Sequence, residues 1–168
     1  MPFDPPYQPD PAVFPALSAS GFSQTSPRDR RYNCIAWAVG QKESRSFWWP
    51  GPPLDGKWPA GVPRNDSIAA FQMAFTTEGY HPCSDGSLET GYEKIALYGL
   101  DGHVKHAARQ LSTGEWTSKL GRDADITHSL DALNSFGTYG YGTVVAFMKR
   151  QVSPGLANYL NHIPSTRT

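Results

Sequence analysis

One cysteine in the sequence occupies a position that suits a nucleophile. Cys34 follows Asn33 at the start of a short apolar segment, residues 35–39, which ends at Gly40 and is predicted to form a buried helix. If Asn33 caps this helix, the free N–H groups and positive dipole end of its first turn stabilise a Cys34 thiolate. The N–H of Cys34 itself can also help to hold the oxyanion that forms when a thiolate attacks a carbonyl. The alternative is a small buried apolar residue, because free cysteines are commonly buried.

A nucleophilic cysteine needs a general base, and the segment that offers one is predicted to be a β-hairpin. Residues 106–111 and 115–120 are expected to be its two strands. Residues 112–114 between them suit a three-residue loop, with Gly114 in the left-handed position. His106 opens the first strand, which is a rigid platform for a base.

The hairpin register predicts which side chains lie beside His106. His106 faces Leu120, and Ser118 lies diagonal to His106 on the same face of the sheet, roughly 7–8 Å away between backbones. Ser118 is therefore the candidate that orients the imidazole. Glu115 falls on the other face, although a one-residue shift in register would reverse this, so the choice between Ser118 and Glu115 stays open. The alternative is that His106 is a surface residue and Ser118 a polar filler.

The elements around the hairpin predict an α+β domain. Asp66 is expected to cap a helix from residue 67 to about 77, which ends at Gly79. The apolar side chains of this helix are expected to face inward: Ile68, Phe71, Met73 and Phe75. Helices come first and an antiparallel meander follows, which is the order of an α+β fold.

Four further segments complete the prediction. Residues 93–98 and 143–148 are rich in apolar and β-branched side chains and are expected to be strands, the second of them buried. Residues 126–133 are expected to form a short helix. Residues 44–65 hold several tryptophans and prolines and are expected to form a long ordered loop.

The length of 168 residues suits one domain with extensions at its ends. Residues 1–28 contain seven prolines and no helical or strand periodicity, so they are expected to form an extended or disordered arm. Whether this arm covers the site stays open. Residues 29–152 are expected to be the folded domain, and residues 153–168 a weakly patterned tail.

The composition excludes several classes of function. Lys and Arg number 15 and Asp and Glu number 15, so the net charge of +0 argues against nucleic-acid and polybasic membrane-surface binding. We expect no membrane span and no Sec signal peptide, which predicts a cytoplasmic protein or one secreted by another route. Two cysteines match no zinc motif, and His103 and His106 point to opposite faces of a strand, so no metal or other cofactor is expected. A disulfide between Cys34 and Cys83 stays open, and the oligomeric state is not predicted.

Several segments together resemble a known family. They are residues 32–38 (YNCIAWA), 93–98 (EKIALY), 106–111 (HAARQL) and 116–121 (WTSKLG), with tryptophan–proline loops between the first two. This set resembles an uncharacterised bacterial domain family over about residues 32–150. The resemblance implies membership of that family and no measured activity.

The layout is also distantly similar to papain-like cysteine hydrolases of the NlpC type. There, a cysteine opens a helix, a histidine opens a strand, and a polar residue lies on the next strand. The resemblance implies a papain-like fold with N-terminal helices on an antiparallel sheet, and a catalytic set of Cys34, His106 and Ser118. The twelve-residue step from His106 to Ser118 fits that family, although the third residue there is commonly His, Asn, Gln or an acid.

These observations predict a cysteine-dependent hydrolase or acyl transferase that acts on an amide bond. The expected reactions are peptide hydrolysis, amide hydrolysis and deamidation, and the partner is a peptide or amide substrate. We expect Trp37, Trp49 and Trp116 to contact that substrate. The alternative is a non-catalytic binding module, in which Trp48, Trp49 and Trp58 form an exposed aromatic surface for a sugar or peptide. Burial of these rings would argue against such a surface.

Overall fold

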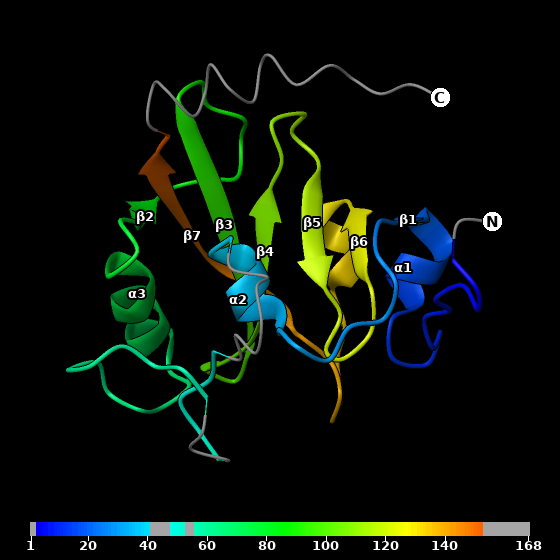
Figure 1. Ribbon diagram of the computed structural model, residues 1–168, viewed down its shortest axis with the longest axis horizontal. Helices are drawn as coiled ribbons and strands as arrows, with labels where there is room; N and C mark the ends of the chain where they lie inside the picture. Colours follow the sequence, from blue (N-terminus) through cyan, green and yellow to red (C-terminus); the bar gives the residue numbers. More distant parts are fainter. Residues whose placement is uncertain (1–2, 41–47, 53–55, 153–168) are drawn as a thin grey trace.

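A seven-stranded antiparallel sheet forms the centre of the protein (Figure 1), with strand order β1-β6-β5-β4-β3-β7-β2. The structure is a computed structural model, which describes residues 3–40, 48–52 and 56–152. The mixed α+β class agrees with the prediction from sequence. No helix among the described residues is long and apolar enough to cross a membrane. The elements are α1 (Pro15–Ser20), β1 (Ser23–Gln24), α2 (Cys34–Ala38), α3 (Ile68–Thr76), β2 (His81–Cys83), β3 (Tyr92–Leu100), β4 (His103–Gln110), β5 (Trp116–Lys119), β6 (Asp125–His128), the 3-10 helix η1 (Leu130–Leu133) and β7 (Thr143–Gln151).

The hairpin of β4 and β5 has the predicted register. Gln110 pairs with Trp116, and the N–H of Leu111 donates to the carbonyl of Glu115 at 2.8 Å. Gly114 has a φ of 90°, the left-handed conformation that the loop requires. Strand β4 begins at His103, three residues earlier than expected, because pairing with β3 continues to that residue.

The two faces of the sheet carry separate apolar clusters. Paired residues of neighbouring strands point to the same face, so Leu97 and Ala107 share one face, and Tyr98 and His106 share the other. The first face joins a cluster with the side chains of α2 and α3. The second face joins a cluster with α1 and η1, so that His106 lies on the side that does not carry α2.

Helix α2 begins as predicted, because Asn33 caps it. The Asn33 side chain accepts a hydrogen bond from the N–H of Ala36 at 3.1 Å. The same side chain donates to the carbonyl of Trp48 at 2.7 Å and accepts from the N–H of Trp48 at 3.1 Å. One asparagine therefore holds both the helix start and a distant loop, and this fixes where Cys34 lies.

The helix predicted over residues 126–133 is wrong. Its first part is strand β6, which pairs with β5 through Ser118↔Ile126 and Trp116↔His128. Only the four residues of η1 are helical. The apolar segment was short enough to fit either a helix or a strand. Hydrogen bonding to the edge of β5 favoured the strand.

Two details of the predicted helix at residues 67–77 are also corrected. Ser67, not Asp66, is the N-cap of α3, and its hydroxyl accepts from the N–H of Ala70 at 3.1 Å. Asp66 instead accepts from the His103 ring at 2.7 Å. Met73 is 46% exposed and does not face inward.

The N-terminal segment contains short elements where an extended arm was expected. Pro15 occupies the first turn of α1, where a proline costs no hydrogen bond, so the prolines here start a helix and do not prevent one. Leu17 is buried, and β1 pairs with β6. The predicted tail at residues 153–168 lies outside the described residues, as do residues 44–47 and 53–55 of the expected long loop.

Candidate active site

A buried chain of hydrogen bonds joins three side chains on one face of the sheet. Nε2 of His106 lies 2.9 Å from Oγ of Ser118, which confirms the contact expected from the hairpin register. The same Oγ lies 2.7 Å from Nε2 of His128 on β6. Nδ1 of His128 lies 2.8 Å from the carbonyl oxygen of Ser129, which ends the chain.

His128 was missed from sequence because residues 126–133 were interpreted as a helix. A strand over residues 125–128 would have placed His128 on the face that carries Ser118. The position of His128 could therefore have been predicted from the alternation of side chains along a strand. The second missed residue, Tyr141, comes from the loop before β7, and no sequence pattern predicts its position.

Aromatic rings hold the imidazole of His106 in place. The ring of Tyr141 stacks on it, with centroids 4.2 Å apart and planes 6° apart. The ring of Tyr98 meets it edge-on at 5.6 Å. His106 is fully buried, and its Nδ1 has no hydrogen-bond partner among the described residues.

Burial keeps both histidines of the chain neutral. Burial, with a smaller contribution from His128, lowers the pKa of His106 well below its ordinary value. Burial also lowers the pKa of His128 to about 4, against the hydrogen bond to the Ser129 carbonyl. Near neutral pH each ring therefore carries one proton, on one of its two nitrogens.

Cys34 lies beside β4, next to the residues at which β4 and β5 stop pairing. The β4–β5 ladder ends at the pair Arg109↔Thr117, so the N–H of Ala107 has no partner on β5. This N–H is directed at the sulfur of Cys34. Backbone N–H groups point along the sheet, toward the neighbouring strand. The thiol therefore lies on the β5 side of β4, at the N–H that would bind β5 if the β4–β5 ladder continued.

The thiol of Cys34 is protonated in this environment. Burial raises its pKa to about 11, against the hydrogen bonds from the N–H groups of Ala107, Ile35 and Cys34 itself. Cys34 is 8% exposed. The expected thiolate at a helix N-terminus is therefore not the resting form, because the loss of hydration outweighs the three N–H groups.

Cys34 and His106 are close in the fold but not hydrogen-bonded. His106 directly precedes Ala107, and the sulfur contacts the N–H of Ala107. The side chain of His106 leaves β4 on the face opposite α2, and among the described contacts its ring meets Ser118, Tyr98 and Tyr141.

The structure does not bring together the three tryptophans expected to contact substrate. Trp37 lies on the α2 side, and its Nε1 donates to Oγ1 of Thr117 at 3.1 Å. Trp49 also lies on that side, with its ring edge-on to Phe71. Trp116 is 4% exposed on the opposite face, in the cluster that contains Ala108 and Leu120.

The tryptophans of the alternative aromatic surface mostly pack against the core. Trp48 is buried, and the ring of Trp58 meets Phe71 edge-on at 5.1 Å. Trp49 contacts the same phenylalanine at 5.6 Å. Two of the three rings therefore pack against Phe71 of α3 and the third is buried in the same cluster, so they do not form an open platform.

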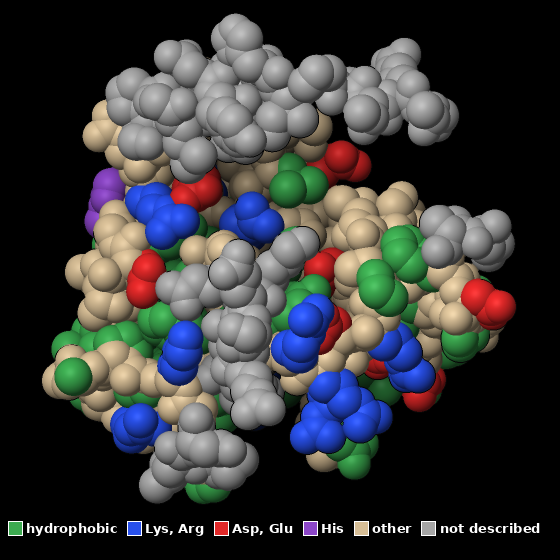
Figure 2. Space-filling model, viewed as in Figure 1, with side chains coloured by type: hydrophobic (Ala, Val, Ile, Leu, Met, Phe, Trp, Pro, Cys, Tyr) green, Lys and Arg blue, Asp and Glu red, His purple; other side chains and the backbone are tan. Residues whose placement is uncertain are grey.

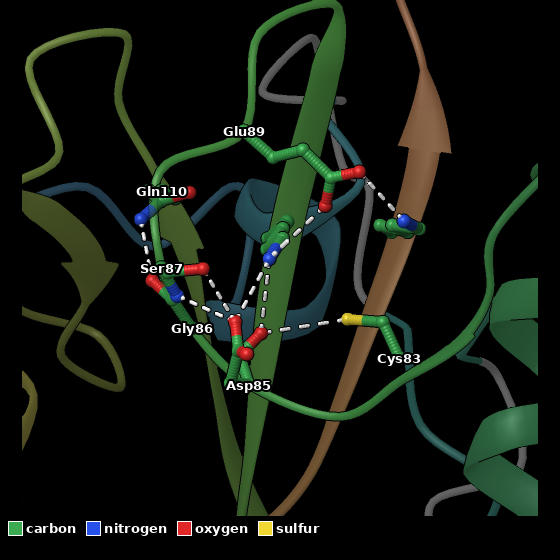
Figure 3. Close-up of polar contacts among 8 residues, drawn as sticks. Cys83, Asp85, Gly86, Ser87, Glu89 and Gln110 are labelled. Carbon is green, nitrogen blue, oxygen red and sulfur yellow. Dashed lines mark hydrogen bonds and ion pairs between the residues drawn. The ribbon is translucent and has the colours of Figure 1, made fainter.

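The second cysteine belongs to a separate polar cluster (Figure 3). Cys83 Sγ donates to the carbonyl of Asp85 at 3.6 Å, and the buried Lys94 donates to the same carbonyl at 3.1 Å and to the Asp85 carboxylate at 3.2 Å. Glu89 binds both Lys94 and Lys149, which ties this loop to β3 and β7. Cys34 and Cys83 are both free, so the disulfide that was left open does not form.

The charges of the described residues do not indicate a metal site or a surface of one sign. No group of three or more His, Cys, Asp or Glu side chains is placed to hold a metal ion in residues 3–40, 48–52 and 56–152. Figure 2 shows basic side chains beside acidic ones on the visible face of the molecule.

The structure thus defines an α+β protein with a buried hydrogen-bonded chain of two histidines and a serine, and with a buried cysteine in the cluster on the other face of the sheet. The chain belongs to a family of domains of unknown function, DUF7689, whose family model matches residues 23–149. This agrees with the expectation of an uncharacterised domain family. No curated protein and no solved structure matches the chain.

Proposed function

We propose that this protein is a cysteine-dependent hydrolase or acyl transferase that acts on an amide bond, with Cys34 as nucleophile and His106 as general base. The observation that supports it most is the hydrogen bonding of His106. Its Nε2 is held by Ser118 at 2.9 Å, and its Nδ1 is buried without a partner. With Nε2 held by Ser118, the nitrogen of His106 that could accept a proton from the thiol is Nδ1.

The surroundings of the sulfur also support a nucleophile. Three backbone N–H groups, from Ala107, Ile35 and Cys34, are directed at it and would stabilise a thiolate once it forms. For the proton to move, the sulfur must exchange its contact with Ala107 for one with Nδ1 of His106.

The proposed reaction then has two stages. Nδ1 of His106 takes the proton from Cys34 Sγ, the sulfur attacks the carbonyl carbon of the amide, and the N–H of Cys34 donates to the oxyanion. The protonated ring gives its proton to the departing amine, which leaves a thioester on Cys34. Water, or another acceptor, attacks the thioester with His106 again as base, and this restores the thiol.

A helix that begins with the cysteine and a strand that carries the histidine are also features of the papain-like arrangement of the NlpC type, which we propose for this fold. The binding-module alternative has less support, since the tryptophan rings it requires lie against Phe71 or in the core. An exposed aromatic surface for a sugar or peptide would need these rings to be open to solvent.

The proposal is tested by the reactivity of Cys34 in the folded protein. Native protein is treated with iodoacetamide at pH 7, and separately with p-nitrophenyl acetate as acyl donor, and modification of each cysteine is followed by mass spectrometry. We expect an acetyl adduct on Cys34 that turns over, and alkylation about 10²-fold slower in His106→Gln and His106→Ala. Cys83→Ser is the matched control and should react at Cys34 like the wild type. The proposal is overturned if Cys34 reacts only after unfolding in urea, or if both His106 variants react as fast as the wild type.

A further inference from the structure

The direction of the hydrogen bonds around His128 determines which nitrogen of His106 is the base. The Ser129 carbonyl oxygen has no proton to donate, so Nδ1 of His128, at 2.8 Å, must carry the hydrogen. His128 is neutral near pH 7, so its Nε2 then holds a lone pair. This nitrogen accepts the hydroxyl proton of Ser118 at 2.7 Å.

The same reasoning extends from Ser118 to His106. A serine hydroxyl has one proton, and Ser118 has already donated it to His128. Oγ of Ser118 can therefore only accept from Nε2–H of His106, at 2.9 Å. The one proton of neutral His106 is thus on Nε2, and its Nδ1 holds a lone pair. This is the nitrogen that has no hydrogen-bond partner among the described residues.

We propose that His128 is a positioning residue that, through Ser118, holds His106 in the tautomer with a proton on Nε2 and so makes Nδ1 the base. Its use in catalysis rests on the proposed function, whereas the tautomer itself does not. No direct contact between His128 and the sulfur is required.

The aromatic neighbours make this control effective. Tyr141 stacks on the His106 ring and Tyr98 meets it edge-on, so the ring is held in its plane. Without His128, the Ser118 hydroxyl is free to donate to Nε2 of His106. The ring proton would then move to Nδ1, and a protonated Nδ1 cannot accept the proton of Cys34.

Nitrogen NMR of the imidazole rings tests the proposal without any substrate. In full-length protein labelled with ¹⁵N-histidine, at pH 7, the ring nitrogen that carries the proton is identified by its shift and its coupling to ring protons, and His106→Gln assigns the signals. We expect the Nε2–H tautomer in the wild type. We expect the same in His128→Gln, because the glutamine oxygen can accept from Ser118 while its NH₂ group donates to the Ser129 carbonyl. In His128→Leu we expect the Nδ1–H form to become populated.

The outcomes separate this proposal from the hydrolase proposal. A wild-type His106 that carries its proton on Nδ1 overturns the inference, and this result needs no variant to fold. An unchanged Nε2–H signal in folded His128→Leu also overturns it. If the tautomers behave as expected, acetylation of Cys34 should fall about 10²-fold in His128→Leu and be retained in His128→Gln. Expected tautomers with no adduct on Cys34 in the wild type would refute the hydrolase and leave the positioning role intact.

Discussion

Mild acid should destabilise the folded protein through its two buried histidines. Burial lowers the pKa of His128 to about 4 and that of His106 well below its ordinary value. An unfolded histidine has a pKa of about 6.5. Below that pH the unfolded chain therefore binds protons that the folded chain does not. Stability is fully present above about pH 6.5 and is lost as the pH falls toward the folded pKa.

The size of the effect follows from the pKa shift of His128. A fall from 6.5 to about 4 corresponds to about 3 kcal/mol of unfolding free energy. Within this window the slope is about 1.4 kcal/mol per pH unit for each buried histidine. His106 adds to the slope with the same sign. Two carboxylates titrate below this window: hydrogen bonds from Arg31 lower the pKa of Asp29 to about 2, and those from Ser87 do the same for Asp85.

Urea unfolding followed by tryptophan fluorescence measures the free energy of unfolding between about pH 4.5 and 7. In acid, unfolding lets His106 and His128 each bind one proton, and His128→Gln removes one of these. The slope of the unfolding free energy against pH should therefore fall by about 1.4 kcal/mol per pH unit. Met73→Gln is the matched control, because that side chain is 46% exposed and the change removes no titratable group; its slope should equal that of the wild type. A wild-type slope near zero, or equal slopes for the wild type and His128→Gln, would refute the burial argument.

Two further predictions concern the backbone that positions the site. Ser67→Ala should cost about 1 kcal/mol in urea unfolding because α3 loses its cap, whereas Asp66→Ala leaves that cap in place; equal losses would contradict the assignment of Ser67. Gly142→Ala should abolish folding or cost at least about 3 kcal/mol, because φ is 75° and the added Cβ would lie 1.8 Å from the Gly99 oxygen. Gly40→Ala, with a φ of 85° and no atom near the new Cβ, is the control and should cost only about 1 kcal/mol in thermal unfolding.

Local signals were sufficient for the elements that carry the candidate site. Asn33 before an apolar run was enough to predict a capped helix with Cys34 in its first turn. Gly114 in a three-residue loop was enough to predict the register that brings Ser118 to His106. A cap and a turn depend on atoms within a few residues of each other, and for that reason a single sequence is sufficient to specify them.

Where local signals competed, the tertiary structure decided. The sequence of residues 125–128 is compatible with a helix or a strand, and hydrogen bonding to the edge of β5 makes it a strand. His128 contacts Ser118 only because this strand forms. Ser67 and Asp66 are both good caps, and Asp66 instead binds His103 from β4. The prolines of the N-terminal segment could extend the chain or start a helix, and burial of Leu17 against the second cluster accompanies the helix.

The sequence alone determined that Cys34 begins a helix and that His106 lies on a strand, because helix caps and hairpin turns are local. It did not determine that α2 lies on the face opposite the His106 side chain, or that the sulfur lies beside the N–H of Ala107. It also did not determine the protonation of the site. Burial reverses the thiolate expected at a helix N-terminus and raises the pKa of Cys34 to about 11. Loss of hydration depends on every group packed around an atom, and only the complete fold brings those groups together.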